Sequence, residues 1–108
     1  MYREASPWQL AGLRDASMNF EWDKNKRRSN IVKHEFDFLD IGQLFSGDHI
    51  KVKAKPDLGG EQRFLAIGCI YGICATVIYT ERNGATRIIS LRKARKNEQQ
   101  RHQTIYNG

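Results

Sequence analysis

The sequence holds few of the features that identify a membrane protein or a secreted protein. Its longest apolar stretch, from Cys69 to Tyr79, includes Gly72 and Thr76 and is too short to cross a bilayer. The first residues have no apolar segment of the kind found in signal peptides. Two cysteines in 108 residues form neither a metal-ligand pattern nor a disulfide framework. We therefore expect a cytoplasmic protein that does not bind a membrane.

The motifs of several common enzyme classes are missing as well. The chain has no glycine-rich loop that cradles phosphates, no cluster of metal ligands and no G-x-S-x-G turn that carries a nucleophile. We therefore expect neither a cofactor nor a bound metal. The formal net charge of +6 makes polyanions, or an acidic protein, the expected ligands.

The first residues differ in character from the remainder. Hydrophobic residues make up 40% of the chain, which is typical of a globular protein, but only Trp8, Leu10 and Leu13 could pack from residues 1–17. One hypothesis is that residues 1–17 are an N-terminal extension and that a single domain occupies residues 18–108. The alternative is a short helix, beginning at Ser6–Pro7, that docks on the domain.

Hydrophobic periodicity predicts an α+β domain with the element order β-α-α-β-β-β-β-α. A short aromatic strand at 19–22 precedes a basic helix at 24–34, for which Asp23 is the expected N-cap. A second helix begins after the N-cap Asp37 and ends near Gly47. An antiparallel meander and a basic C-terminal helix follow, and we expect them at 50–55, 63–71, 73–81, 86–92 and 95–106.

Two tight turns set the expected strand pairing. Asn83–Gly84 is a strong hairpin signal, and Tyr71–Gly72 is consistent with a second two-residue loop. Counting outward from these turns places Arg92 in one row with Ala75 and Gly68. Two small side chains beside an arginine would leave a hollow in which its planar guanidinium could grip a phosphate.

Other basic residues are further candidates for binding a polyanion. The same register places Arg63 and Arg87 on either side of Thr80, although both arginines could also be solvated strand ends. Three lysines alternate with apolar residues on the strand at 50–55. Lysines in such positions also protect an edge strand from aggregation. These residues are Lys51, Lys53 and Lys55.

Candidates for proton transfer lie on the two polar helices. Lys33 and His34 end the basic helix, where they either complement the helix dipole or carry protons. Glu98 is either a proton carrier or an ion-pair partner of Arg95 or His102. A base, an acid and cations suffice for metal-free RNA cleavage, because the nucleophile is the 2′-hydroxyl of the RNA itself.

Several segments resemble the BrnT family of type II toxins. The stretch Phe20-Glu21-Trp22-Asp23 is followed by Lys26, Asn30 and Lys33-His34 at the expected spacing. The segments 61–64, 67–68, 79–82 and 87–92 continue the resemblance, which includes Ala94 and Glu98 and covers about residues 19–106. The chain departs from the family at Glu35, where a glycine is usual, and in its extension at residues 1–17.

The resemblance implies a RelE-like ribonuclease toxin fold, with an antiparallel sheet, two N-terminal helices and a C-terminal helix. It also implies RNA cleavage that inhibits translation. The expected partner is a BrnA-like antitoxin with a ribbon-helix-helix DNA-binding domain, so that operator DNA is bound only through the antitoxin. The alternative is a non-catalytic subunit of an autorepressing complex, which binds nucleic acid or protein.

Positions carried over from the family imply roles for the candidate residues. Arg92 and Arg63 would bind the scissile phosphate, and the proton-transfer candidates are Lys33, His34 and Glu98. Tyr106 would stack on a base or donate a proton. The remaining basic candidates would bind the RNA, and these are Arg87, Lys51, Lys53 and Lys55.

Overall fold

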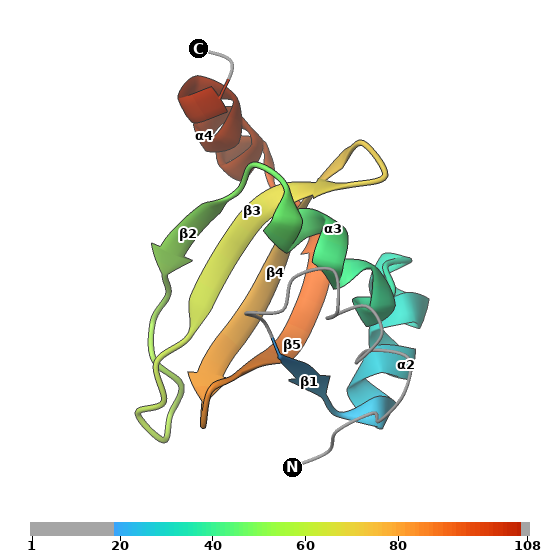
Figure 1. Cartoon of the computed structure of the whole chain (residues 1–108), viewed down its shortest axis with the longest axis vertical. Helices are drawn as coiled ribbons and strands as arrows, with labels where there is room; N and C mark the ends of the chain where they lie inside the picture. The colour runs from blue at the N-terminus through green and yellow to red at the C-terminus, as the bar shows by residue number, and fades with distance from the viewer. Residues whose placement is uncertain (1–18, 107–108) are drawn as a thin grey trace.

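The computed structural model describes residues 19–106, which form a five-stranded sheet with helices around it (Figure 1). The predicted boundary between an extension and a domain at Met18 lies outside these residues. No helix in the described part of the chain is both long enough and apolar enough to span a bilayer. The elements are β1 (Phe20–Trp22), α2 (Lys24–His34), the 3₁₀ helix η1 (Phe38–Asp40), α3 (Ile41–Ser46), β2 (Ile50–Lys53), β3 (Phe64–Ile70), β4 (Ile73–Arg82), β5 (Ala85–Lys93) and α4 (Lys96–Tyr106).

The sheet has the strand order β1-β5-β4-β3-β2. The antiparallel meander from β2 to β5 confirms the prediction, but β1 pairs with β5 in parallel, so the expectation of a wholly antiparallel sheet was wrong. The segment between β1 and β2 contains α2, η1 and α3, which is long enough to carry the chain across the sheet. The pairing places Trp22 opposite Ile88, and both side chains are buried in the core.

The β4–β5 hairpin has one irregularity that changes the position of Arg92. The register follows the prediction from the Asn83–Gly84 turn as far as Tyr79 and Ile88, and it then shifts by one residue at a β-bulge. Ile89 is the additional residue. Arg92 therefore lies opposite Thr76, and the predicted pairing of Arg92 with Ala75 was wrong.

The hollow predicted beside Arg92 is absent for the same reason. Gly68 does pair with Ala75, but adjacent residues of a strand point to opposite faces, so these two lie on the face away from Arg92. The space over Gly68 is taken by α3, since a Cβ atom at this glycine would lie 2.9 Å from Cγ of Leu44. Glycine thus allows α3 to approach the sheet closely.

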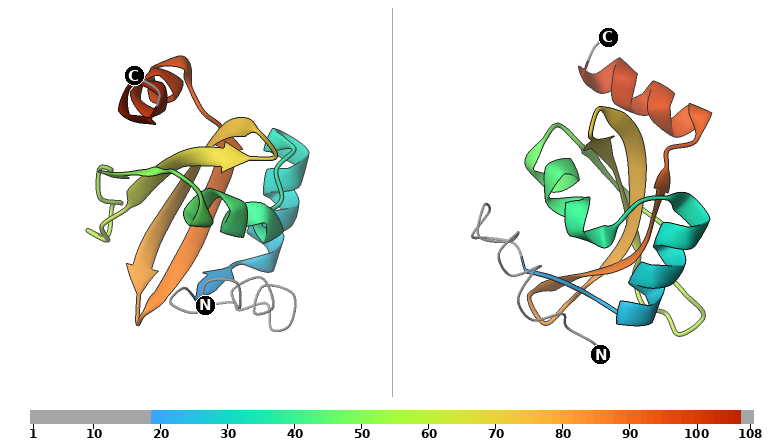
Figure 2. Two further views of the ribbon diagram at one scale, coloured as in Figure 1. Left: turned by 45° about the horizontal axis from the view of Figure 1, so that its top comes forward. Right: turned by 90° about the vertical axis from the view of Figure 1, so that its right-hand side faces the viewer.

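One face of the sheet is covered by α3, as both views in Figure 2 show. Gly47 follows its last residue and serves as the C-cap, as predicted. Aromatic rings fill the space between α3 and the strands. Phe45 of α3 lies with its ring centroid 5.4 Å from that of Phe20 and 5.3 Å from that of Tyr79. The core consists of Phe20, Trp22, Phe38, Ile41, Leu44, Phe45, Ala66, Ile70, Ala75, Val77, Tyr79, Ile88 and Leu91.

The opposite face of the sheet, which we call the open face, is bounded by two helices. α2 lies along the β5 edge, and α4 lies across the end of the sheet where β5 ends (Figures 1 and 2). α4 is held by side chains near its C-terminus. The phenol of Tyr106 donates to the carbonyl of His49 at 2.5 Å, and Nε2 of His102 lies 3.0 Å from the carbonyl of Asp48.

The turn between α2 and η1 passes through a non-glycine residue with a left-handed backbone. Glu35 caps α2 with a φ of 61°, in the left-handed region that favours glycine. Asp23 is the N-cap of α2, as predicted, and accepts from the backbone N–H of Asn25 at 2.7 Å. Asp37 is an N-cap too, but it caps the 3₁₀ turn η1 rather than α3.

Candidate functional site

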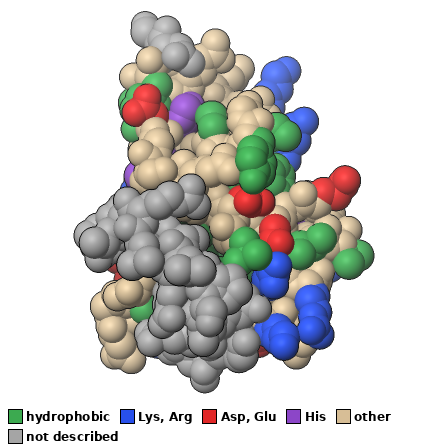
Figure 3. Space-filling view, turned by 45° about the vertical axis from the view of Figure 1, so that its right-hand side comes forward, with side chains coloured by type: hydrophobic (Ala, Val, Ile, Leu, Met, Phe, Trp, Pro, Cys, Tyr) green, Lys and Arg blue, Asp and Glu red, His purple; other side chains and the backbone are tan. Residues whose placement is uncertain are grey.

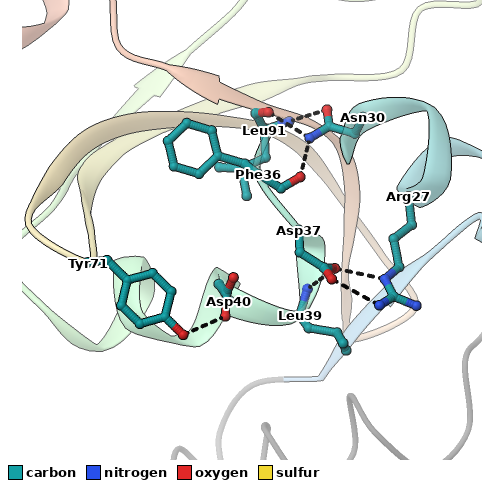
Figure 4. A network of polar contacts seen from close by, with 8 residues as sticks. All are labelled: Arg27, Asn30, Phe36, Asp37, Leu39, Asp40, Tyr71 and Leu91. Atoms are coloured by element: carbon teal, nitrogen blue, oxygen red, sulfur yellow. Dashed lines mark hydrogen bonds and ion pairs between the residues drawn. The ribbon is translucent and has the colours of Figure 1, made fainter. Parts of the chain in front are cut away.

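A buried asparagine attaches α2 to the edge of β5 (Figure 4). The side-chain amide of Asn30 donates to the carbonyls of Leu91 at 2.7 Å and Phe36 at 2.9 Å. Its oxygen accepts from the backbone N–H of Leu91 at 3.0 Å and from the hydroxyl of Ser90 at 3.3 Å. β1 ends opposite Ile88, so Asn30 supplies the hydrogen bonds that another strand would make to this edge of β5.

An ion pair between Arg27 and Asp37 fixes the start of η1 against α2. Arg27 donates from Nε and Nη2 to the two carboxylate oxygens of Asp37, at 2.7 and 2.9 Å (Figure 4). Burial alone would raise the pKa of Asp37, but the hydrogen bonds and charge of Arg27, together with the hydrogen bond from the Leu39 N–H, lower it below its ordinary value. The last turn of α2 therefore has a defined position beside β5.

That position creates a pocket between α2 and the bulge of β5. Its volume is about 320 Å³. Lys33 is exposed and His34 is partly buried at its rim, and Ile89 and Ser90 line the pocket from β5. The lining residues are Lys26, Ser29, Asn30, Lys33, His34, Ile89 and Ser90.

The open face carries a further cationic group, Arg87 of β5. Arg87 lies opposite Thr80 in β4, as predicted, and opposite Glu21 in β1. Nη1 of Arg87 lies 3.6 Å from Oε2 of Glu21, and both atoms are buried without a hydrogen-bond partner in the described part of the chain. Glu21 is only 2% exposed. The guanidinium of Arg87 is thus paired by charge but retains an unused N–H group.

Arg63, on the other side of Thr80, also makes only a long ion pair with the residues that the structure describes. Its carbonyl accepts from the backbone N–H of Ala54 at 2.9 Å, which extends the β2–β3 ladder by one residue. Because Phe64 packs on the core side, strand alternation places Arg63 on the open face with Thr80. Its Nη2 lies 3.7 Å from Oδ2 of Asp57, and its buried Nε has no acceptor among residues 19–106.

Arg92, in contrast, is engaged in a tight ion pair. Its Nη1 and Nη2 donate to the two carboxylate oxygens of Glu98 at 2.8 and 2.9 Å. The same carboxylate accepts from the hydroxyl of Thr76 at 3.0 Å and from the backbone N–H of Arg95 at 2.7 Å. Glu98 is therefore half of a capping box for α4, and its ion-pair partner is Arg92 rather than Arg95 or His102.

These contacts change the acidity of Glu98. The hydrogen bonds from Arg92 lower its pKa most, those from Arg95 N–H and Thr76 add to the effect, and burial opposes it, so that the pKa is about 2. A carboxyl group with this pKa is ionised at neutral pH. It can accept a proton only weakly and is a poor proton donor.

The predicted RNA-binding lysines lie apart from the arginines. Lys51 pairs with Ala66, which faces the core side, so its side chain is on the face that carries α3. Its Nζ lies 4.3 Å from the ring centroid of Phe64 and 3.3 Å from Oε2 of Glu81. Lys53 shares that face by alternation, and Lys55 lies beyond the end of β2. Both are exposed.

Positive charge is concentrated on α2. Figure 3 shows Lys and Arg side chains gathered at the lower right of this view, in the region of α2. Five of the eleven residues of the helix are basic, and only Asn30 is buried. The aromatic residues at the two ends of the helix, Trp22 and Phe38, contact each other in the core with ring centroids 6.0 Å apart. The basic residues are Lys24, Lys26, Arg27, Arg28 and Lys33.

The structure brings some candidates together and separates others. Lys33 and His34 share a pocket with Ser90, and β5 carries Arg87 before this position and Arg92 after it. Tyr106 is bound to the carbonyl of His49 at the far end of α4. The sequence alone assigned no role to Asn30. Its role in attaching the helix becomes recognisable once burial is known, because Asn30 is polar and is the only buried residue of the basic helix α2. No group of three potential metal ligands from His, Cys, Asp and Glu occurs among residues 19–106.

Comparison with protein families places this site in a known context. Residues 22–98, well over half of the chain, match the family described as the ribonuclease toxin BrnT of type II toxin–antitoxin systems. The match begins in β1 and ends at Glu98, so it includes Asn30, Arg87 and Arg92 but not Tyr106. A search of curated proteins returned no match. The chain thus belongs to the BrnT family of ribonuclease toxins, whose members act on RNA and are paired with an antitoxin.

Proposed function

We propose that this protein is a RelE-like endoribonuclease toxin that inhibits translation by cleaving RNA without a metal ion. The observation that carries the proposal is the pocket in which Lys33 and His34 lie beside Ser90, on the strand that also presents Arg87 and Arg92. The element order β-α-α-β-β-β-β-α, with a 3₁₀ turn between the first two helices, is consistent with a RelE-like topology. Family membership supports the substrate class.

The proposed reaction is an attack by the 2′-hydroxyl of the RNA on the adjacent phosphorus. One group removes the proton from this hydroxyl, and another gives a proton to the departing 5′ oxygen. His34 is suited to either step, because one ring nitrogen of an imidazole can accept a proton and the other can donate one. Lys33 would stabilise charge on the phosphate or carry a proton, and it is exposed at the same rim.

The arginines divide into two groups in this proposal. Among the described residues, Arg63 and Arg87 make only long ion pairs, at 3.7 and 3.6 Å, and their side chains are 35% and 19% exposed, so the accessible part of each guanidinium can bind phosphate oxygens. Arg92 is held by Glu98, and its side chain is 16% exposed, which leaves part of it accessible to a ligand. We therefore assign Arg87 and Arg63 to binding of the phosphate backbone, and Arg92 to binding of the scissile phosphate, with Glu98 as its positioning residue.

The lysines and Tyr106 have a less direct role. Lys51 and Lys53 lie on the face with α3, where they could attract RNA that extends beyond the open face. Lys55 lies in the loop after β2. Tyr106 would need to release the carbonyl of His49 before stacking on a base. These residues are proposed to contribute to affinity rather than to the chemical step.

The proposed partner is a BrnA-like antitoxin with a ribbon-helix-helix domain, through which the complex would bind operator DNA. Family membership supports an antitoxin, and the basic helix α2 supports an acidic contact on it. The exposed residues Ile31 and Val32 lie between Arg28 and Lys33, so an acidic segment with apolar side chains would match this surface.

Site-directed variants test the proposed chemistry. His34→Gln and Lys33→Gln should each lower the rate of RNA cleavage by about 100-fold or more, a typical effect for a proton-transfer group. The matched control is Lys24→Gln, which makes the same charge change at the other end of α2. Thermal melting of each variant separates loss of catalysis from loss of folding. Full cleavage activity in folded His34→Gln and Lys33→Gln proteins would contradict the roles proposed for these two residues. A native chain that binds RNA but does not cleave it would contradict the proposed activity and favour a non-catalytic binding subunit.

A further inference from the structure

A pair of cysteines occupies directly opposite positions in the β3–β4 hairpin. The register pairs Cys69 with Cys74, and both are free thiols. The sequence contains two cysteines in all, so these are the complete set. Cys69 is exposed and Cys74 is half-buried.

The geometry of the Tyr71–Gly72 turn determines whether Cys69 and Cys74 form a hydrogen-bonded or a non-hydrogen-bonded pair. Tyr71 and Gly72 have φ angles of 50° and 76°, which are the positive values of a type I′ turn. In such a hairpin the residues that flank the turn, Ile70 and Ile73, form the hydrogen-bonded pair. Pairs alternate along an antiparallel ladder, so Cys69 and Cys74 occupy the next, non-hydrogen-bonded pair.

A non-hydrogen-bonded pair suits a disulfide. Its Cα atoms are about 4.5 Å apart, within the range of roughly 4.4 to 6.8 Å that disulfides span. The side chains of directly opposite residues point to the same face of the sheet. The hairpin can therefore form the bond with a small adjustment of the two strands and without unfolding.

The two thiols differ in their environment. Cys69 is open to solvent, so a small oxidant can reach it. Burial, with the nearby charges of Cys69 and Glu98, raises the pKa of the Cys74 thiol. The carbonyl of Cys74 accepts from the backbone N–H of Ala94 at 3.0 Å, just before α4 begins. Cys69 is thus the thiol that reacts first, and Cys74 is the one that completes the bond.

We propose that Cys69 and Cys74 form a reversible oxidation site, at which a hydroperoxide converts the two thiols into an intramolecular disulfide. The thiolate of Cys69 attacks one peroxide oxygen, the O–O bond breaks, and the released alkoxide or hydroxide takes up a proton. The thiolate of Cys74 then attacks the resulting sulfenic sulfur, the S–S bond forms as the S–O bond breaks, and the departing hydroxide takes up a proton to give water. Two thiols lose two electrons and one peroxide gains them.

This site is separate from the proposed chemistry of RNA cleavage and adjoins it. Thr76, two residues after Cys74, donates to Glu98, which holds Arg92. The disulfide would therefore lie at the junction of β4 with the first turn of α4. A thiol reductant restores the original state by thiol–disulfide exchange at the exposed sulfur of Cys69.

The test treats the purified full-length protein with hydrogen peroxide, alkylates the remaining thiols under denaturing conditions and measures the intact mass. Both alkylation sites should disappear together, so that no singly alkylated species accumulates. The product should be a monomer about 2 Da lighter than the reduced chain, and dithiothreitol should restore both thiols.

The variants Cys69→Ser and Cys74→Ser provide the comparison. Each retains one thiol and should give no lighter monomer under the same conditions. The proposal is contradicted if the native chain keeps both thiols alkylatable at peroxide concentrations that oxidise free cysteine. It is also contradicted if the products are disulfide-linked dimers, or chains that carry added oxygen on separate cysteines.

Discussion

Arg92 of β5 and Glu98 of α4 form a two-pronged ion pair, with N–O distances of 2.8 and 2.9 Å. The pair joins the last strand to the C-terminal helix and leaves both side chains largely buried, at 16% and 8% exposure. Thr76 and the N–H of Arg95 complete the coordination of the carboxylate. Glu98 thus connects three elements of the molecule at the edge of the open face.

This ion pair predicts a specific dependence of stability on pH. The pKa of Glu98 falls from an ordinary value of 4.5 to about 2 on folding. A lowered pKa stabilises the folded state above pH 4.5, and the contribution is lost as the pH falls toward 2. The shift corresponds to on the order of 3 kcal/mol.

Glu98→Gln should therefore be less stable than the native chain at pH 7, and the difference should shrink between pH 4.5 and pH 2. Urea unfolding at several pH values measures it. Comparing the two proteins removes the contributions of other carboxylates, including Asp37, whose pKa is also lowered. A difference that stays constant over this range would show that Glu98 does not act through its charge.

Asn30 supplies a prediction about the attachment of α2. Asn30→Ala removes the partners of the Leu91 N–H and carbonyl at the β5 edge, and buried backbone groups without partners are costly. We expect a loss of about 2 to 4 kcal/mol in the free energy of unfolding. Asn25→Ala is the matched control, since Asn25 is exposed on the same helix. Equal effects of the two substitutions would show that Asn30 does not hold the helix.

Gly68 tests the close packing of α3. A methyl group at this position would meet Cγ of Leu44 at 2.9 Å and Cβ of His49 at 3.1 Å. Gly68→Ala should cost about 1 to 3 kcal/mol through overpacking. At Gly59 the nearest atom would be Oδ1 of Asp57 at 3.4 Å, so Gly59→Ala should have little effect on the melting temperature. An unchanged melting temperature for Gly68→Ala would mean that α3 does not pack this closely.

The proposed contact between the basic helix α2 and the antitoxin leads to a prediction about the rate of association. With a net charge of +6 and five basic residues on α2, association with an acidic antitoxin should be steered by long-range attraction. The association rate constant should fall steeply between about 50 and 500 mM salt, because the Debye length shortens. Arg28→Gln should reduce this salt dependence more than Lys53→Gln, which lies on another face. A rate constant that is independent of salt would exclude steering.

Local signals predicted much of the fold. The basic helix at 24–34 with its Asp23 cap, the Asn83–Gly84 hairpin and the meander agree with the structure, because capping and turn chemistry depend on neighbouring residues. The parallel pairing of β1 was not predictable in this way. It depends on contacts of Trp22 with residues distant in sequence.

The candidate site was harder to predict than the fold. A single bulged residue, Ile89, moves Arg92 from a row with Ala75 to a row with Thr76, and no turn signal marks it. The partner of Glu98 also depends on this register, which is why local spacing favoured Arg95 or His102. The lysines of β2 were identified as exposed, but which face they occupy follows only from the observed pairing of Lys51 with Ala66.

The identity of the RNA termini produced by the enzyme tests the central claim most directly. The full-length chain should cleave RNA in the presence of excess EDTA and leave a 2′,3′-cyclic phosphate and a 5′-hydroxyl, because the 2′-hydroxyl is the nucleophile. DNA of the same sequence should remain intact. Cleavage that stops with EDTA and returns with a divalent ion, or that leaves a 5′-phosphate and a 3′-hydroxyl, would contradict the metal-independent mechanism.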